Sequence, residues 1–133
     1  MTKDIDKQKY VGYVTKAENS LKISKIVLNE KAYDAAVVSA IHSGINAVDA
    51  LTTCFLGKRS SGQHTDFIPL VKAILDPQGQ HDIEKQYKLL LSLKNSSEYQ
   101  PDLMSLKDAE DSIKSAQRIL DKVKAKLVEK TDG

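Results

Sequence analysis

Apolar residues recur at steps of three and four along most of this 133-residue chain, and this spacing constrains the fold more than any other feature. It places apolar side chains on one face of each of several successive helices. The sequence contains no stretch with the alternation typical of strands and no Rossmann-type glycine pattern. The predicted helices span about residues 4–28, 32–56, 64–75, 81–94 and 105–127.

These helices predict an all-α fold, an antiparallel up-and-down bundle of four long helices and one short helix. The second helix is crowded with alanine and glycine, which lets neighbouring helices approach closely, so we expect it at the centre of the bundle. A chain of this length can bury one proper core but leaves little room for a second. We therefore expect a single domain over residues 1–133.

Residues at the predicted helix ends agree with these boundaries. Gly57 is well placed to end the second helix, and Pro69 fits only in the first turn of the third. The position of Pro69 places His64 at or just before the start of that helix. Asp76 to Gly79 has the composition of a turn. Ser105 and Asp108 have the spacing of a capping box at the start of the last helix.

Composition excludes several classes of protein. The formal net charge of +2 is too small to indicate a nucleic-acid-binding protein by itself. The single cysteine, Cys54, cannot form an internal disulfide, and its apolar neighbours place it on a core-facing helix surface. The N-terminus lacks a signal-peptide pattern, and no stretch approaches the ~20 apolar residues of a membrane span. We expect a cytoplasmic protein without membrane contact.

Most familiar catalytic motifs are also missing from the sequence. The three histidines, His42, His64 and His81, do not pair at the spacing that places two metal ligands on one helix face. The serines do not lie in a Gly-x-Ser-x-Gly elbow, and the residues after Gly57 lack the full Walker spacing. We therefore expect neither a metal site nor a bound cofactor.

The segment from Arg59 to His64 (RSSGQH) is the strongest candidate for chemistry. It can be a solvated polar loop that holds both residues by chance. It also suffices for metal-free RNA cleavage, in which the 2′-hydroxyl of the RNA itself attacks the phosphate. An imidazole can transfer the protons near neutrality, and a permanently charged guanidinium can stabilise the phosphorane. Asp49 and Thr52 lie one or two turns upstream on the second helix.

Two regions of the sequence resemble HEPN domains (higher eukaryotes and prokaryotes nucleotide-binding). The first comprises Ser39–Leu51 (SAIHSGINAVDAL) and Gly57–His64 (GKRSSGQH). The second comprises Asn95–Tyr99 (NSSEY) and Ser105–Glu110 (SLKDAE), which are similar to the R-x-x-A-E-Y segment that leads into the last helix of the family. The resemblance extends from about residue 32 to residue 127 and implies an all-α bundle of four or five helices.

The resemblance also implies an activity. The ribonuclease branch of the family carries an arginine and a histidine separated by four to six residues, often with a polar residue directly after the arginine; Arg59, Ser60 and His64 match this pattern. It implies a metal-independent endoribonuclease that leaves a 2′,3′-cyclic phosphate and a 5′-hydroxyl. Such enzymes usually form homodimers with a shared cleft. Many are toxins, neutralised by a small nucleotidyltransferase or another antitoxin.

The predicted site follows from this resemblance. Arg59 would stabilise the transition state, His64 would be the acid or base, and Asp49 would orient one of them or polarise the 2′-hydroxyl. The predicted contacts with RNA or nucleotide are Lys58, Ser60 and Tyr99, of which Tyr99 can instead close the end of the bundle. Two other functions stay open: a catalytically inactive HEPN module that binds nucleotide, RNA or a partner protein, and a helical adaptor in which the loop has no role.

Overall fold

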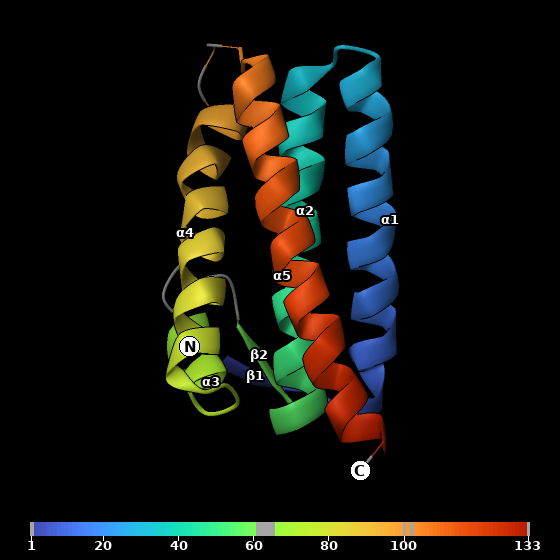
Figure 1. Ribbon diagram of the computed structural model, residues 1–133, viewed down its shortest axis with the longest axis vertical. Helices are drawn as coiled ribbons and strands as arrows, with labels where there is room; N and C mark the ends of the chain where they lie inside the picture. The colour runs from blue at the N-terminus through green and yellow to red at the C-terminus, as the bar shows by residue number, and fades with distance from the viewer. Residues whose placement is uncertain (1, 61–65, 100, 102, 133) are drawn as a thin grey trace.

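The computed structural model describes residues 2–60, 66–99, 101 and 103–132 of the chain. Four long helices lie side by side and alternate in direction, and a short helix lies at one end (Figure 1). These helices are α1 (Tyr10–Asn29), α2 (Tyr33–Leu56), α3 (Phe67–Lys72), α4 (Pro77–Tyr99) and α5 (Leu106–Asp132). The expected all-α antiparallel bundle is therefore confirmed.

Helix α2 lies at the centre of the bundle, as its small residues predict. It packs against α1, α4 and α5, and most of its side chains from Ala36 to Cys54 are buried. Two serine hydroxyls join it to α1: Ser24 Oγ donates to the carbonyl oxygen of Ala36 over 2.6 Å, and Ser43 Oγ donates to that of Ala17 over 2.7 Å. Both bonds satisfy buried hydroxyls where the two backbones are close.

The bundle also contains two short strands that the sequence did not predict. Strand β1 (Thr2–Asp4) pairs with β2 (Lys58–Ser60) in a two-stranded antiparallel sheet, in which Lys3 lies opposite Arg59. Strands of three residues are too short to show an alternating pattern, and β1 is exposed throughout. The segment expected to be a loop after α2 therefore begins as a strand, held by a partner more than fifty residues earlier in the chain.

Three helices have clearly different boundaries from those expected. Helix α3 spans only Phe67–Lys72 rather than residues 64–75, so it begins three positions after residue 64 instead of at or next to it. Helix α1 begins at Tyr10 rather than Asp4, because β1 and a 3-10 helix, η1 (Lys7–Lys9), precede it. Helix α4 begins at Pro77 rather than His81 and continues to Tyr99. Asp76 precedes it and accepts a hydrogen bond from the Gly79 amide over 2.7 Å. The segment read as a turn is thus an N-cap followed by proline at the first helical position.

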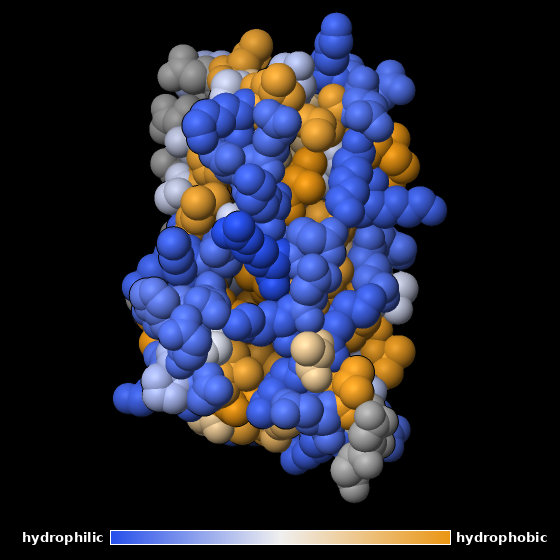
Figure 2. Space-filling view, in the orientation of Figure 1, coloured by the Kyte–Doolittle hydropathy of each residue, from blue (hydrophilic) through white to orange (hydrophobic). Residues whose placement is uncertain are grey.

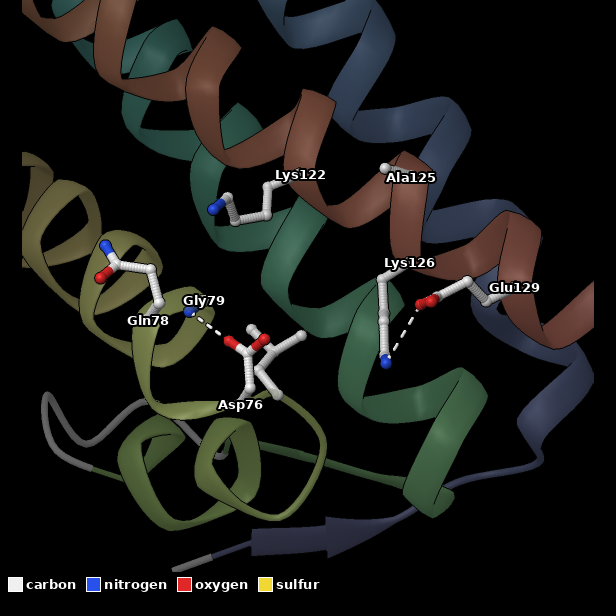
Figure 3. Close-up of a pocket in the computed structure, with 8 residues that line it drawn as sticks. Asp76, Gln78, Gly79, Lys122, Ala125, Lys126 and Glu129 are labelled. Atoms are coloured by element: carbon white, nitrogen blue, oxygen red, sulfur yellow. Dashed lines mark hydrogen bonds and ion pairs between the residues drawn. The ribbon is translucent and has the colours of Figure 1, made fainter.

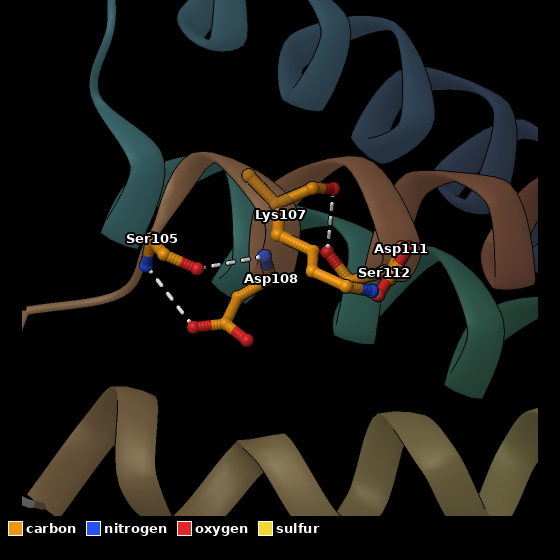
Figure 4. Close-up of polar contacts among 6 residues, drawn as sticks. Ser105, Lys107, Asp108, Asp111 and Ser112 are labelled. Atoms are coloured by element: carbon orange, nitrogen blue, oxygen red, sulfur yellow. Dashed lines mark hydrogen bonds and ion pairs between the residues drawn. The ribbon is translucent and has the colours of Figure 1, made fainter.

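Other predicted helix ends are confirmed. Gly57 ends α2 with a left-handed φ of 65°, and Pro69 lies in the first turn of α3. Figure 4 shows the capping box of α5: the Ser105 amide donates to Asp108 Oδ2, and the Asp108 amide donates to Ser105 Oγ, each over 3.0 Å. The described part of the chain contains no helix that combines the length and apolar character needed to cross a bilayer.

Replacing Gly44 by alanine tests the close packing around α2. A Cβ at this position would lie directly against Leu90 Cδ1 and 3.5 Å from Ile119 Cδ1, and both side chains are buried. We expect Gly44→Ala to lower the free energy of unfolding by ~1–3 kcal/mol, because overpacking of the core outweighs the ~0.5–1 kcal/mol that alanine gains in helix propensity. Urea-induced unfolding followed by circular dichroism measures the change.

Gly12→Ala is the matched control. Gly12 is exposed within α1, and a Cβ there would meet no atom within 4 Å. Alanine should therefore raise stability by ~0.5–1 kcal/mol through its helix propensity. Equal effects of the two substitutions would contradict the close approach at Gly44.

Candidate functional site

Arg59 lies in the middle of β2, immediately beyond the end of α2. Its side chain is partly buried, and Nη1 donates to the carbonyl oxygen of Ser60 over 3.1 Å. The short sheet fixes the backbone at this position, since Arg59 lies opposite Lys3 in the antiparallel register. Strand β2 also packs against α2 and α3. A fixed guanidinium is thus held at the edge of the bundle.

Asp49 lies on α2 close to Arg59. Its side chain is almost completely buried, with 8% of its surface exposed. Burial raises the pKa of the Asp49 carboxyl to about 7, and the positive charge of Arg59 acts in the opposite direction. Both effects are expected for a carboxyl group removed from water near a cation. The structure therefore brings together two of the three predicted catalytic residues, and Asp49 can exchange a proton near neutral pH.

The end of α2 around Asp49 contains further buried polar groups. Thr52 Oγ1 donates to the backbone carbonyl of Asp49 over 3.4 Å. Thr53 follows Asp49 by one helical turn, and its buried hydroxyl has no hydrogen-bond partner among the described residues. Polar groups without partners are uncommon in protein interiors and are often found at functional sites. This end of α2 is thus more polar than the rest of the core.

An aromatic pair lies near this end of α2, and one of its members, Tyr87, is close to Asp49. Tyr87 of α4 packs on Phe67, the first residue of α3, with ring centroids 4.2 Å apart. Burial raises the pKa of the Tyr87 phenol, and the nearby negative charge of Asp49 raises it further. The phenol therefore stays protonated across the physiological range. No local sequence pattern relates either residue to Asp49, so the sequence alone did not indicate that they lie near the site.

His64, the third predicted catalytic residue, lies outside the described residues. The elements that precede and follow it along the chain are β2 and α3, and these two pack against each other. Its role as the acid or base stays a prediction.

The predicted substrate contacts are not all in the same region. Ser60 ends β2 next to Arg59, and Lys58 begins this strand. Lys58 Nζ forms an exposed ion pair with Asp4 over 2.6 Å, and this hydrogen bond and charge hold the pKa of Asp4 below its usual value. Tyr99 ends α4 at the other end of the bundle (Figure 1).

The position of Tyr99 separates it from the other predicted contacts. Its backbone follows Tyr87 by twelve residues of α4, which corresponds to ~18 Å along the helix axis. The Tyr99 side chain lies outside the described part of the structure. Helix α4 therefore carries the Tyr99 backbone far from Asp49 of the same chain.

A separate pocket lies between the start of α4 and the C-terminal half of α5 (Figure 3). Its volume is about 460 Å³. Its charged groups are already partnered: Lys122 pairs with Asp82 over 2.7 Å and Lys126 with Glu129 over 3.1 Å. Asp76 caps α4 through the Gly79 amide. None of these contacts points to a particular ligand, and we assign none to this pocket.

A comparison with protein families agrees with the helical arrangement. The family model of the HEPN domain matches residues 10–126, from the first residue of α1 to a point near the end of α5. No curated protein matches the chain.

The raised pKa of Asp49 predicts that stability depends on pH. An unfolded aspartate has a pKa of ~3.9, so between this value and about 7 the folded chain holds a proton that the unfolded chain releases. The free energy of unfolding therefore falls as pH rises through this window. Between pH 5 and pH 8 we expect it to fall by ~2–3 kcal/mol more in the wild type than in Asp49→Asn, measured by urea-induced unfolding.

Asp121→Asn is the control for this measurement, because Asp121 is exposed on α5 and accepts a hydrogen bond from Gln117. Its pH profile should follow that of the wild type. Parallel profiles of the wild type and Asp49→Asn would show that Asp49 is not a buried titrating group.

Proposed function

The chain belongs to the HEPN domain family, and on this basis we propose that it is a metal-independent endoribonuclease with Arg59, His64 and Asp49 in its active site. Membership of the family supports a role related to nucleotides or RNA. Cleavage, and the residues that perform it, are the proposal.

The observation that carries this proposal is the proximity of Asp49 and Arg59. The buried carboxyl of Asp49 has a pKa of about 7, and it lies close enough to the Arg59 guanidinium on β2 for the two charges to interact. Perturbed titratable groups beside a fixed charge are typical of catalytic sites. A plain structural ion pair would instead lower the pKa of the carboxyl below its usual value.

The proposed reaction begins with attack of the ribose 2′-hydroxyl on the adjacent phosphorus. One titratable group removes the 2′-hydroxyl proton as the new O–P bond forms, and another gives a proton to the 5′-oxygen as its bond to phosphorus breaks. The products are a 2′,3′-cyclic phosphate and a 5′-hydroxyl. Arg59 stabilises the negative charge that develops on the phosphorane oxygens.

His64 and Asp49 share the remaining roles in this proposal. An imidazole with an ordinary pKa of ~6.5 transfers protons near neutral pH, so His64 is assigned as the acid or base. Asp49 orients Arg59 or His64, or polarises the 2′-hydroxyl, and its pKa of about 7 leaves part of the population protonated at neutrality. Two such groups provide one acceptor and one donor at the same pH.

Lys58 and Ser60 are proposed to contact the phosphate backbone. Exposed ion pairs contribute little free energy, so Lys58 can exchange Asp4 for a phosphate group at small cost. We further propose a homodimer in which two sites share one cleft, an isologous arrangement of the ordinary two-fold kind. Tyr99 lies at the other end of α4, and we therefore do not include it in the proposed site of the same chain.

We also propose that the enzyme acts as the toxin of a toxin–antitoxin or phage-defence pair. Its antitoxin would then be a small nucleotidyltransferase or another protein encoded beside it. The support for this role is the resemblance of the segment from Arg59 to His64 to the ribonuclease branch of the family.

Cleavage of RNA in the presence of EDTA tests the enzymatic proposal. The wild type should produce fragments with 2′,3′-cyclic phosphate ends, identified by mass spectrometry. Loss of the guanidinium in Arg59→Ala should slow cleavage by ~10²–10³-fold, and loss of the imidazole in His64→Ala by ~10²–10⁴-fold. These ranges follow from removing one charge-stabilising group or one proton-transfer group.

Two substitutions of the same chemical type serve as controls. Arg118→Ala removes the other arginine of the chain, which is exposed on α5, and His81→Ala removes an exposed histidine of α4. Both variants should cleave RNA at the wild-type rate. No cleavage by the wild type, or equal cleavage by all four variants, would overturn the enzymatic proposal. Binding of RNA without cleavage would instead identify an inactive binding module.

A further inference from the structure

A groove runs between α1 and α5 on a different side of α2 from Asp49. The structure contains two adjoining cavities along this seam, with volumes of about 390 Å³ and 280 Å³, and Lys124 lines both. The floor of the groove is apolar, formed by buried leucines at positions 21, 120 and 127. None of the predicted site residues lines either cavity.

Apolar side chains also remain exposed along the rims. Val11 is 56% exposed, Ile26 47% and Val128 53%, and each lines one of the two cavities. On the face shown in Figure 2, apolar side chains are visible between hydrophilic ones on the side where α1 and α5 lie. Apolar surface enclosed by a polar rim is typical of a protein-binding site.

The charged residues that line the groove are mostly basic. Lys22, Lys25 and Lys124 line it together with a single carboxylate, Glu18. The groove therefore carries a net charge of +2, as large as that of the whole chain. The contacts of these lysines are exposed: Lys124 and Glu18 form a pair over 2.9 Å, and Lys25 donates a hydrogen bond to Gln117 over 2.8 Å. Lys22 has no ion-pair partner among the described residues.

The length and residue spacing of the groove are compatible with a helix as its occupant. On α5 the lining residues Gln117, Leu120, Lys124 and Leu127 follow the three–four spacing of a helix–helix contact surface. From Val11 to Ile26 the groove follows fifteen residues of α1, or ~22 Å, which corresponds to about four turns of a partner helix.

We infer that the α1–α5 groove docks an acidic amphipathic helix of a different protein. Leucine-type side chains of that helix would cover the leucine floor, and its carboxylates would face Lys22, Lys25 and Lys124. A second copy related by a two-fold axis would bring the same lysines together, and this repulsion disfavours self-association through the groove. A bilayer fits a convex apolar face better than a concave one.

Fluorescence anisotropy with a synthetic peptide tests this inference without any cleavage assay. The probe is a labelled helix of about 18 residues with leucines at three–four spacing and flanking glutamates. The control peptide carries lysine at each glutamate position. We expect the acidic peptide to bind the wild type, more weakly as salt is added, and to perturb amide resonances of α1 and α5. The lysine peptide should not bind.

Two variants with equal charge changes locate the binding site. Lys22→Glu/Lys25→Glu reverses two exposed charges in the groove, and Lys85→Glu/Lys88→Glu reverses two exposed charges on α4. The first variant should weaken peptide binding by about tenfold or more, and the second by less than about twofold. Circular dichroism checks that both variants remain folded.

Several outcomes would overturn the inference: no binding of the acidic peptide, equal binding of the lysine peptide, or equal weakening by both variants. Two further measurements test other occupants. A dimer that dissociates in Lys22→Glu/Lys25→Glu, measured by sedimentation equilibrium, would identify a second copy in the groove. Binding to phosphatidylserine vesicles that is lost in the same variant would identify a membrane surface.

Discussion

The close packing of α2 against its three neighbouring long helices is the interaction on which the rest of the structure depends. Gly44 lets α4 and α5 approach, and the serine hydroxyls of Ser24 and Ser43 bond to backbone carbonyls where α1 and α2 meet. Interiors are packed as densely as organic crystals, so a helix this deeply buried has one position and one rotation. That rotation determines which residues near its C-terminal end face the candidate site.

The same burial makes the Asp49 carboxyl an unusually weak acid. The carboxyl is buried on α2, and its removal from water raises its pKa even though Arg59 is near. Strand β1, which precedes η1, thus helps to form the site, because it pairs with β2, the strand that carries Arg59. Core packing and site electrostatics are therefore two consequences of one arrangement in this protein.

Local features of the fold were predictable and long-range ones were not. The helical periodicity, the stop at Gly57, the first-turn Pro69 and the capping box of α5 depend on residues within a few positions of one another. The pairing of β1 with β2 was missed because it joins distant segments through their backbones, which carry little sequence signal. The early start of α4 was missed because Asp76 and Pro77 suit both a turn and a helix N-terminus.

The sequence by itself determined that this chain forms a helical bundle, that α2 is central, and that Arg59 and Asp49 are candidates for chemistry. The family that it indicated, HEPN, is also the one whose model matches residues 10–126. Only the tertiary structure decided that Asp49 is buried near Arg59, that Tyr87, packed on Phe67, lies near it, and that a basic groove runs between α1 and α5. The physical reason is that helix periodicity and capping are local, whereas burial and electrostatic coupling depend on which distant segments the packing brings together.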